Sequence, residues 1–413
     1  MRLKLLTVAA SASIVLAGIS IPLGLVSSSA SASAKKALPP VHILVTTPIS
    51  AVGLVANAEM TVDAVKAAAR VLNLRGGILG HKVDVTYEDD ANDPTTAVTE
   101  IEAAEGTSSK PLAYIDGGPA PTAAAVLPIL NSDKTISFNI GPTATSPVGK
   151  DFPYNFDMSP STANYAAAFC PYVKAHGGTS VGIIYGVDPY GSSLSALINT
   201  DCLADGIKVV GIQSYQDTAI DATPQLLALQ ALNPSYLLFE GYGSVVGYVL
   251  QDINKIGWNV PILGDTAVAA SSEVIGVPPS QGGLLGTPEV ANLKVLVFQS
   301  TVYSKTESNN LTTMIANINR YSGDNDPSSL IFGYQYDSVI LLAAAATQAK
   351  SLKPLKITYA LTHLKLNVAR TGVFANYYFN ASVHAPNEPP SAFDFATPSL
   401  LVNGQYDNPK ASS

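Results

Sequence analysis

The side chains that could catalyse a reaction or hold a metal are few in this chain and widely spaced. Its five histidines lack the spacing of metal ligands, and scattered surface or loop positions explain them better. They are His42, His81, His176, His363 and His384. The glycine-flanked turn of a nucleophilic serine is also missing, because Tyr190-Gly191-Ser192-Ser193 and Tyr242-Gly243-Ser244 both depart from it. The sequence therefore gives no support to hydrolysis by a serine nucleophile or a metal-bound water.

A glycine-rich segment has the outline of a dinucleotide-binding fingerprint. Gly241 to Gly247 follows a strand pattern and opens a helix, with Asp265 about one strand later. Two features speak against this interpretation. The first half of the chain carries no such turn, and an exported protein rarely meets free dinucleotide.

Four carboxylates lie close together at Glu88, Asp89, Asp90 and Asp93. Such a group could bind a cation. The alternative is that these residues are solvated at a strand end and a helix start, where the helix dipole stabilises negative charge. The sequence favours the alternative.

The elements that would position these residues follow the pattern of the stretch from Val71 to Pro94. A helix is expected to end at Arg75, because the paired glycines Gly76 and Gly77 adopt positive φ at little cost. Residues 82–88 then alternate between apolar and polar, which predicts a strand, and a new helix opens after Pro94. Helix, glycine turn, strand and helix form one unit of α/β winding.

The same alternation continues along most of the chain. We expect first-half strands at 41–46, 82–88, 112–115 and 135–138, and second-half strands at 180–185, 207–212, 236–239 and 260–263. Asn57 is expected to cap the helix after the first strand, and the proline-rich segment 139–160 is expected to be a crossover linker. The later part predicts an extended segment at 295–302, helices at 311–321, 330–349 and 355–364, and a strand-like tail at 393–402.

These patterns predict an α/β fold with two doubly wound parallel-sheet lobes joined by a hinge of several crossovers. We expect a signal peptide at 1–34, the first part of lobe 1 at 35–157 and the main part of lobe 2 at 158–286. Residues 287–413 are expected to return to lobe 1, with hinge crossings and the final strands.

The N-terminus reads as an export signal. Arg2 and Lys4 precede an apolar run from Leu5 to Val26, and small residues follow, so we expect cleavage after Ala32 or Ala34. An uncleaved anchor is the alternative that this long run leaves open. No cysteine stands there to carry a lipid, so we expect a periplasmic, extracellular or cell-envelope protein, and no further membrane span.

The charge of the chain argues against polyanionic partners. Lys and Arg number 23 against 31 Asp and Glu, and removal of Arg2 and Lys4 changes the net charge from −8 to 21 − 31 = −10. An acidic protein is a poor ligand for nucleic acid or anionic membranes. The only cysteines, Cys170 and Cys202, lie on two expected helices, and in an exported protein a disulfide between them is a plausible pairing.

Five motifs, in this order, resemble the Leu/Ile/Val-binding type of periplasmic substrate-binding protein, the receptor subunit of ABC importers. They are Gly76-Gly77-Ile78-x-Gly80 with the strand ending Tyr87-Glu88-Asp89-Asp90 and Asp93-Pro94, Gly141 to Pro147, Asp188-Pro189-Tyr190-Gly191, Gly241-Tyr242, and Gly264-Asp265. Each motif lies at or just beyond the carboxyl end of an expected strand, where α/β sheets form their binding crevices. The resemblance implies the type I fold of that family, with a ligand held between two closing lobes.

In lobe 1 the resemblance implies a backbone contact from Ala144 and a hydroxyl contact from Thr145. Thr145 could instead satisfy the backbone of its own loop. The loop after the third strand departs from the family, because Gly117-Gly118-Pro119-Ala120-Pro121-Thr122 replaces a serine-rich run and leaves Thr122 as the remaining polar contact. Binding of an α-amino acid is therefore in question, since a buried carboxylate needs donors.

In lobe 2 the resemblance places Tyr190 and Tyr242 where aromatic rings close on the ligand, although both could simply pack within the protein. Thr266 occupies the position of the acidic residue that binds the ammonium group in relatives. Asp265 lies one position earlier, and either reaches an amine or caps the segment that follows.

The function expected from the resemblance is that of an exported solute receptor without enzymatic activity. It would bind a small amino-acid-like or related metabolite, use no cofactor or metal, act as a monomer and deliver its ligand to a membrane ABC permease. The alternatives are a sensory or scavenging receptor without a permease, and an exported α/β enzyme.

Overall fold

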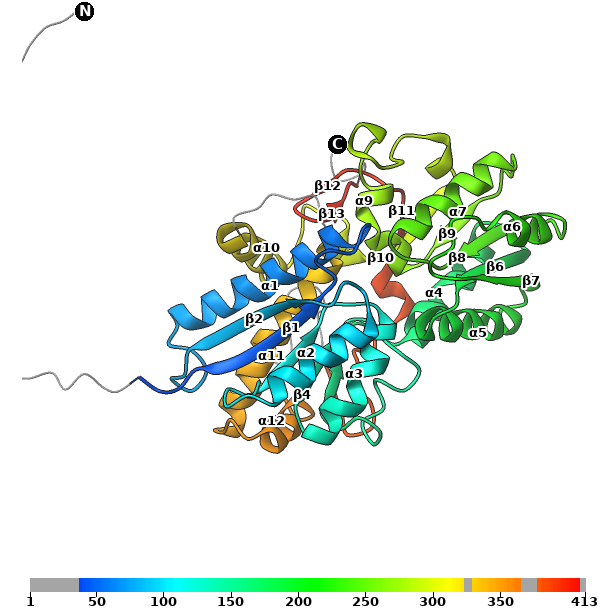
Figure 1. The fold of residues 1–413 in the computed structure, drawn as a ribbon. Helices are drawn as coiled ribbons and strands as arrows, with labels where there is room; N and C mark the ends of the chain where they lie inside the picture. Colours follow the sequence, from blue (N-terminus) through cyan, green and yellow to red (C-terminus); the bar gives the residue numbers. More distant parts are fainter. Residues whose placement is uncertain (1–36, 323–328, 365–376, 409–413) are drawn as a thin grey trace, which may run out of the picture. The chain divides into compact units, whose positions relative to one another are not determined.

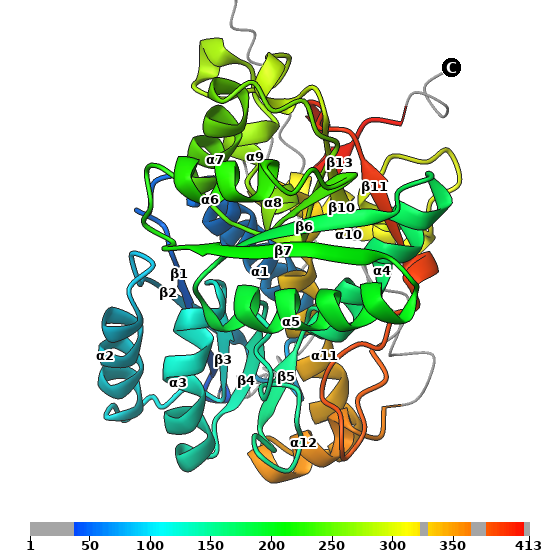
Figure 2. The same ribbon diagram turned by 90° about the vertical axis from the view of Figure 1, so that its right-hand side faces the viewer.

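The computed structural model describes residues 37–322, 329–364 and 377–408. The expected signal peptide at 1–34 lies outside these residues. Residues 38–413 form one compact unit that contains two parallel sheets (Figures 1 and 2).

The first sheet has the strand order β2-β1-β3-β4-β5, and all its pairings are parallel. Its strands are β1 (Val41–Thr47), β2 (Val83–Asp89), β3 (Ala113–Asp116), β4 (Ile136–Asn139) and β5 (Asn155–Asp157). The first four confirm the expected strands. The fifth is a correction, because β5 lies inside the segment that the sequence predicts to be a linker.

The second sheet has the order β11-β10-β9-β8-β6-β7. Its strands are β6 (Ser180–Gly186), β7 (Lys208–Tyr215), β8 (Tyr236–Phe239), β9 (Ile262–Gly264), β10 (Leu293–Phe298) and β11 (Phe393–Ala396). Only β11 is antiparallel, paired with β10. Apart from β11, the order repeats that of the first sheet, which confirms two successive doubly wound units.

Helices connect the strands along the chain and lie beside both sheets (Figure 2). The longer ones are α1 (Val55–Leu74), α2 (Pro94–Glu105), α3 (Ala120–Asp133), α4 (Thr162–Ala175), α5 (Pro189–Ala204), α6 (Thr223–Gln230) and α7 (Ser244–Lys255). After them come α8 (Thr266–Ala270), α9 (Ser272–Ile275), α10 (Asn309–Ser322), α11 (Tyr334–Ala349) and α12 (Pro354–Leu361). A short hairpin of β12 (Leu401–Val402) and β13 (Gln405–Tyr406) follows β11.

The turn after α1 confirms the role of its glycines. Gly76 and Gly77 have φ of +99° and +77°, and a Cβ on Gly77 would lie 1.9 Å from the carbonyl oxygen of His81. Only glycine fits this turn without strain. The cap expected at Asn57 is wrong, because α1 already begins at Val55 and Asn57 lies within its first turn.

The C-terminal third of the chain contributes to both sheets. Helices α10 and α11 pack against α1 beside the first sheet, and α12 packs against α11, whereas β10 and β11 extend the second sheet. The described chain crosses between the sheets after β5, after β10 and before β11. These three crossings form the connection between the lobes.

One apolar helical segment has the length and composition of a membrane span. Residues Leu330–Ala349 meet this test among the described residues, but 78% of the apolar window is buried within the protein. Packing against α1 and α12 accounts for that burial, so the segment is a core helix.

A disulfide joins α4 to α5. Cys170 and Cys202 are both fully buried, and their Cα atoms lie 5.1 Å apart. The pairing that the sequence left open is therefore made in the structure.

Reduction of this disulfide should destabilise the protein. A cross-link over 32 residues removes entropy from the unfolded chain, worth about 3 to 4 kcal/mol in the loop-entropy model. Urea unfolding with and without a reductant measures the difference, and the double variant Cys170→Ser, Cys202→Ser should lose stability with no further effect of the reductant. An unchanged free energy of unfolding after reduction would contradict this expectation.

Candidate functional site

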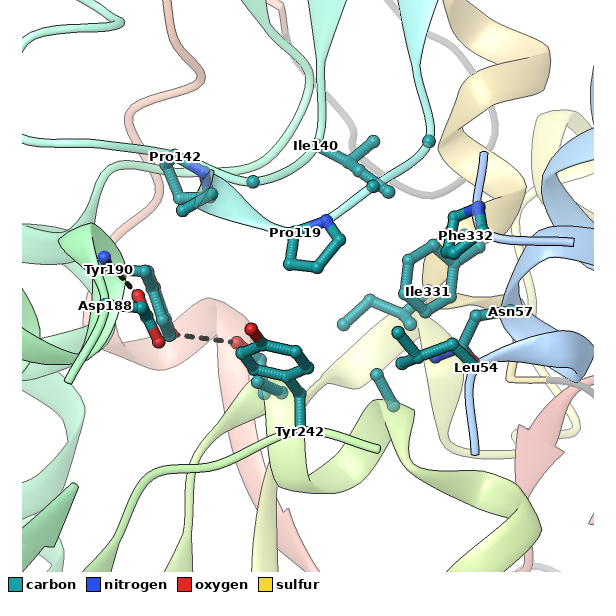
Figure 3. Close-up of a pocket in the computed structure, with 18 of the residues that line it drawn as sticks. Leu54, Asn57, Pro119, Ile140, Pro142, Asp188, Tyr190, Tyr242, Ile331 and Phe332 are labelled. Carbon is teal, nitrogen blue, oxygen red and sulfur yellow. Dashed lines mark hydrogen bonds between the residues drawn. The ribbon is translucent and has the colours of Figure 1, made fainter. Parts of the chain in front are cut away.

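A pocket lies where the carboxyl ends of the two sheets face each other (Figure 3). The first sheet contributes the loops after β1, β3 and β4 through Pro48, Gly117 to Ala120, and Ile140 to Pro142. The second contributes the loops after β6, β8 and β9. In both sheets these loops flank the point where the strand order reverses, which is where doubly wound folds bind ligands.

The lining is mostly apolar. The other lining residues come from the region where α1 begins, from the region where α11 begins, and from lobe 2. They are Leu54, Asn57, Tyr165, Asp188, Tyr190, Tyr242, Thr266, Ala267, Ala270, Ile331, Phe332 and Tyr334. The volume open to the centre of a water-sized molecule is about 90 Å³. In this arrangement of the lobes the pocket suits a compact organic molecule.

The first-sheet wall offers few hydrogen-bond donors. The amide of Gly118 donates to Asp116 Oδ1 at 2.8 Å, and the amide of Gly141 donates to Asn139 Oδ1 at 2.9 Å. Pro119 and Pro142 have no amide hydrogen. The backbone of these loops is therefore largely committed to side chains of its own lobe.

The second-sheet wall presents an acid and two aromatic hydroxyls. Asp188 caps α5, since its Oδ1 accepts from the amides of Tyr190 at 2.6 Å and Gly191 at 3.0 Å. Its Oδ2 is buried and has no hydrogen-bond partner. The hydroxyl of Tyr190 lies 3.3 Å from Thr266 Oγ1. Figure 3 shows Tyr190 and Tyr242 at the edge of the same cavity.

Three further carboxyl groups lie behind this wall. Glu240 Oε2 accepts from the amide of Gly186 at 2.8 Å, and a Cβ on Gly191 would lie 2.4 Å from the same oxygen. Burial raises the pKa of Asp217 and of Asp265 to about 7, and burial together with Asp188 holds the pKa of Glu240 well above its ordinary value. Asp188, whose pKa burial also raises, thus belongs to a group of four neighbouring acids.

The buried acids predict a protein that is more stable at mildly acidic pH. Burial raises the pKa of both Asp157 and Asp265 from 3.8 to about 7. Between these values the folded state binds more protons than the unfolded state, so the free energy of unfolding rises as pH falls from 8 towards 5. We expect the melting temperature of the ligand-free protein to be roughly 2 to 5 °C higher at pH 5.5 than at pH 8.

Differential scanning calorimetry of the ligand-free protein across this pH range tests the expectation. Asp157→Asn should flatten the profile, because it removes one of the buried acids whose pKa is raised. A melting temperature that falls steadily from pH 8 to pH 5.5 would contradict it.

Contacts beside the pocket hold the two lobes together. Glu273 Oε1 of α9 accepts from the amide of Ala56 at 2.5 Å, at the start of α1. Ser244 Oγ donates to the carbonyl of Val52 at 3.1 Å. Gly53, with φ +81°, packs directly against Ser244, and a Cβ on Gly53 would lie 2.6 Å from Ser244 N. The loop after β1 is therefore in direct contact with lobe 2.

Three of the residues predicted to bind ligand line this pocket, namely Tyr190, Tyr242 and Thr266. Asp265 lies outside the lining and caps α8, since its Oδ1 accepts from the amide of Val268 at 3.0 Å. This is the capping role that the sequence left open for Asp265.

The other three predicted residues are not brought into the pocket. Thr122 is buried, and its hydroxyl donates to the carbonyl of Pro119 at 2.7 Å, because α3 already begins at Ala120. Ala144 and Thr145 line a different groove, beside the starts of α4 and α5. The structure therefore does not place the predicted lobe-1 contacts next to the three from lobe 2.

The sequence interpretation missed several residues of the lining. Asp188 belongs to a motif that it had singled out, but only Tyr190 was assigned a role. Asn57 was assigned to a helix cap. Ile331 and Phe332 come from a segment more than 180 residues beyond the lobe-1 loops of the lining, and no local pattern marks them.

The acidic cluster after β2 serves a local structural role. Asp93 caps α2, since its Oδ1 accepts from the amides of Thr95 and Thr96. Asp90 Oδ1 accepts from the amide of Asn92 at 2.8 Å. Among the described residues, no three His, Cys, Asp or Glu side chains are arranged to hold a metal.

Known structures with the same fold are binding proteins. A periplasmic binding protein type 1 from Bordetella pertussis Tohama I aligns with a TM-score of 0.76 at 20% identity, covering 86% of this chain and 96% of its own. The branched-chain amino acid transporter substrate-binding protein LivJ from Streptococcus pneumoniae, in complex with isoleucine, gives 0.68 at 18% identity, covering 87% and 100%. A fatty acid ABC transporter substrate-binding protein from Thermomonospora curvata gives 0.67 at 16% identity, covering 88% and 92%.

At these identities the likeness concerns the fold. No curated protein matches the chain closely enough to count as a relative. The model of one family, described as periplasmic binding protein, matches residues 40–393, from the start of the first strand to the second sheet's last strand. This chain therefore belongs to the periplasmic binding protein family, whose members are ligand-binding receptors.

Proposed function

We propose that this protein is the extracytoplasmic receptor of an ABC importer, which captures a small metabolite between its lobes and presents the closed form to a membrane permease. The observation that carries the proposal is the pocket built from the strand ends of both sheets. A ligand in that position contacts both lobes at once, so its binding energy favours closure.

The ligand is proposed to be amino-acid-like or a related metabolite. Among the solved relatives, one is in complex with isoleucine and another is named for fatty acids. Both of those ligands carry an apolar chain and a carboxylate, and the lining by Pro119, Ile140, Leu54 and Phe332 would accommodate the chain. Tyr190, Tyr242 and Thr266 are the proposed contacts from lobe 2.

Export supports the same function. The expected signal peptide at 1–34 would deliver the receptor outside the cytoplasm, where an importer collects its substrate. We propose a monomer that meets its permease only transiently.

Mass spectrometry of the small molecule released on denaturation tests the proposal. We expect the exported, purified protein to release one compact metabolite, and the ligand-free refolded protein to gain thermal stability when it is returned. Tyr242→Ala should abolish most of that gain without much change in the melting temperature of the ligand-free protein. Recovery of a nicotinamide cofactor, or conversion of the bound compound into a product, would contradict a receptor function.

A further inference from the structure

Two buried acceptors in the pocket have no partner within the protein. Asp188 Oδ2 and Asn57 Oδ1 are both free of hydrogen bonds, although the two residues are only 6% and 5% exposed. Figure 3 shows them on opposite sides of the cavity, Asp188 beside Tyr190 and Asn57 beside Leu54. A buried acceptor without a donor is costly, so a ligand that brings donors to these two atoms is favoured.

The charge around Asp188 points to a cation. Three other acids, Glu240, Asp217 and Asp265, follow the ends of three other strands. The carboxyl group of each interacts electrostatically with that of Asp188. No Lys or Arg is among the residues that line the pocket in the described chain. A positive group beside Asp188 Oδ2 would form a charge-assisted hydrogen bond and favour the ionised form of these acids, whose pKa values burial raises.

The opposite wall disfavours a carboxylate. The amides of Gly118 and Gly141 already donate to Asp116 and Asn139, and Pro119 and Pro142 supply none, which leaves one amide, that of Ala120 at the start of α3. A carboxylate would therefore lose its hydration against apolar rings, in a cavity with acidic side chains nearby and no Lys or Arg among the described residues of its lining.

We infer that the ligand is a primary or secondary amine with an apolar body and no carboxylate, and that its ammonium group binds Asp188 Oδ2. This inference rests on the proposed receptor function and names its ligand class. The apolar body lies against Pro119, Ile140 and Phe332. Asn57 accepts a second N–H or a hydroxyl at the far end of the molecule.

A matched series of three compounds tests the inference by calorimetry on ligand-free, refolded protein. The series is 3-methylbutylamine, leucine and 4-methylpentanoate, which share one branched chain and carry the amine alone, both groups, or the carboxylate alone. We expect the amine to bind at least tenfold more tightly than either of the others.

Asp188→Asn should weaken amine binding by tenfold or more, because it removes the charge and retains Oδ1 as the helix cap. Asp93→Asn is the matched control. Asp93 caps α2 in the same way, also just before a proline, but is exposed and does not line the pocket. It should lose a similar, small amount of stability and keep full amine affinity.

The outcomes separate the ligand class from the receptor function. Leucine or 4-methylpentanoate binding as tightly as the amine, or no binding of the amine, would overturn the inference. So would unchanged amine affinity in Asp188→Asn. The identity of the metabolite released from the native protein tests the receptor function independently. A released carboxylic acid would refute the amine class and still support a receptor.

Discussion

Replacing Gly53 by alanine is expected to weaken ligand binding by about tenfold to a hundredfold, through a block on lobe closure. The new Cβ would lie 2.6 Å from both the amide nitrogen and the Oγ of Ser244. These atoms belong to lobe 2, whereas Gly53 belongs to the loop after β1, so the clash disappears when the lobes separate. The substitution therefore acts on closure and leaves each lobe's core intact. Isothermal titration with the released metabolite measures the effect.

A second glycine provides the control for backbone strain. Gly76 also has positive φ, at +99°, but nothing lies within 4 Å of where its Cβ would be. Gly76→Ala and Gly53→Ala should each lose about 1 kcal/mol of stability. Only Gly53→Ala should also lose ligand affinity, and Gly76→Ala should keep it. Equal affinities in the two variants would show that closure does not require the contact between Gly53 and Ser244.

Replacing Asp157 by alanine is expected to lower the free energy of unfolding by about 3 to 5 kcal/mol. Asp157 is fully buried at the end of β5. Its Oδ2 accepts from Ser146 Oγ at 2.7 Å, and its Oδ1 accepts from Asn155 Nδ2 at 2.8 Å and Asn139 Nδ2 at 3.0 Å. The substitution removes one acceptor from each of these three buried donor groups, which keep only their bonds to the carbonyls of Gly141, Ser146 and Thr143.

Urea unfolding measures this loss. Asp157→Asn is the conservative control, since it keeps the side-chain volume and one acceptor oxygen, and it should lose less than half as much. Asp93→Ala removes a carboxylate with an exposed capping role and should lose much less stability than Asp157→Ala. A loss below that of Asp93→Ala would mean that the buried network around Asp157 contributes little to stability.

The sequence predicted the strands of both sheets well where they are apolar and bounded by glycine or proline. It missed β5 because this strand is three residues long and has Asn155 and Asp157 at its ends. Its stability comes from pairing with β4 and from the hydrogen bonds of Asp157, which link residues far apart in the chain. Local propensity carries no trace of such contacts.

The start of α1 illustrates the same limit. The sequence suggested Asn57 as a cap, because a polar residue preceded a helical stripe. In the structure, an acceptor for the amide of Ala56 comes from Glu273, which is 217 residues away. When the acceptor for a helix's first amides comes from the other lobe, the local sequence carries no signature of it. Asn57 is then not needed as a cap, and it lines the pocket.

The candidate site was predictable only in part. The residues of lobe 2 came from motifs at strand ends, whose position follows from the fold alone. In lobe 1 the sequence showed that Gly117 to Thr122 replaces the serine-rich run of the family. It did not show how this change alters the pocket wall. The prolines start α3 at Ala120, so the chain turns Thr122 back onto Pro119 and presents ring carbons to the pocket.

The three crossings between the sheets also determine when each lobe can finish folding during synthesis. Strands β1 to β5 are complete at Asp157, yet α10 and α11, which pack against α1 beside them, begin only at Asn309. The second sheet in turn receives its edge strand β11 at Phe393. Neither lobe has all its contacts until almost the whole chain has left the ribosome.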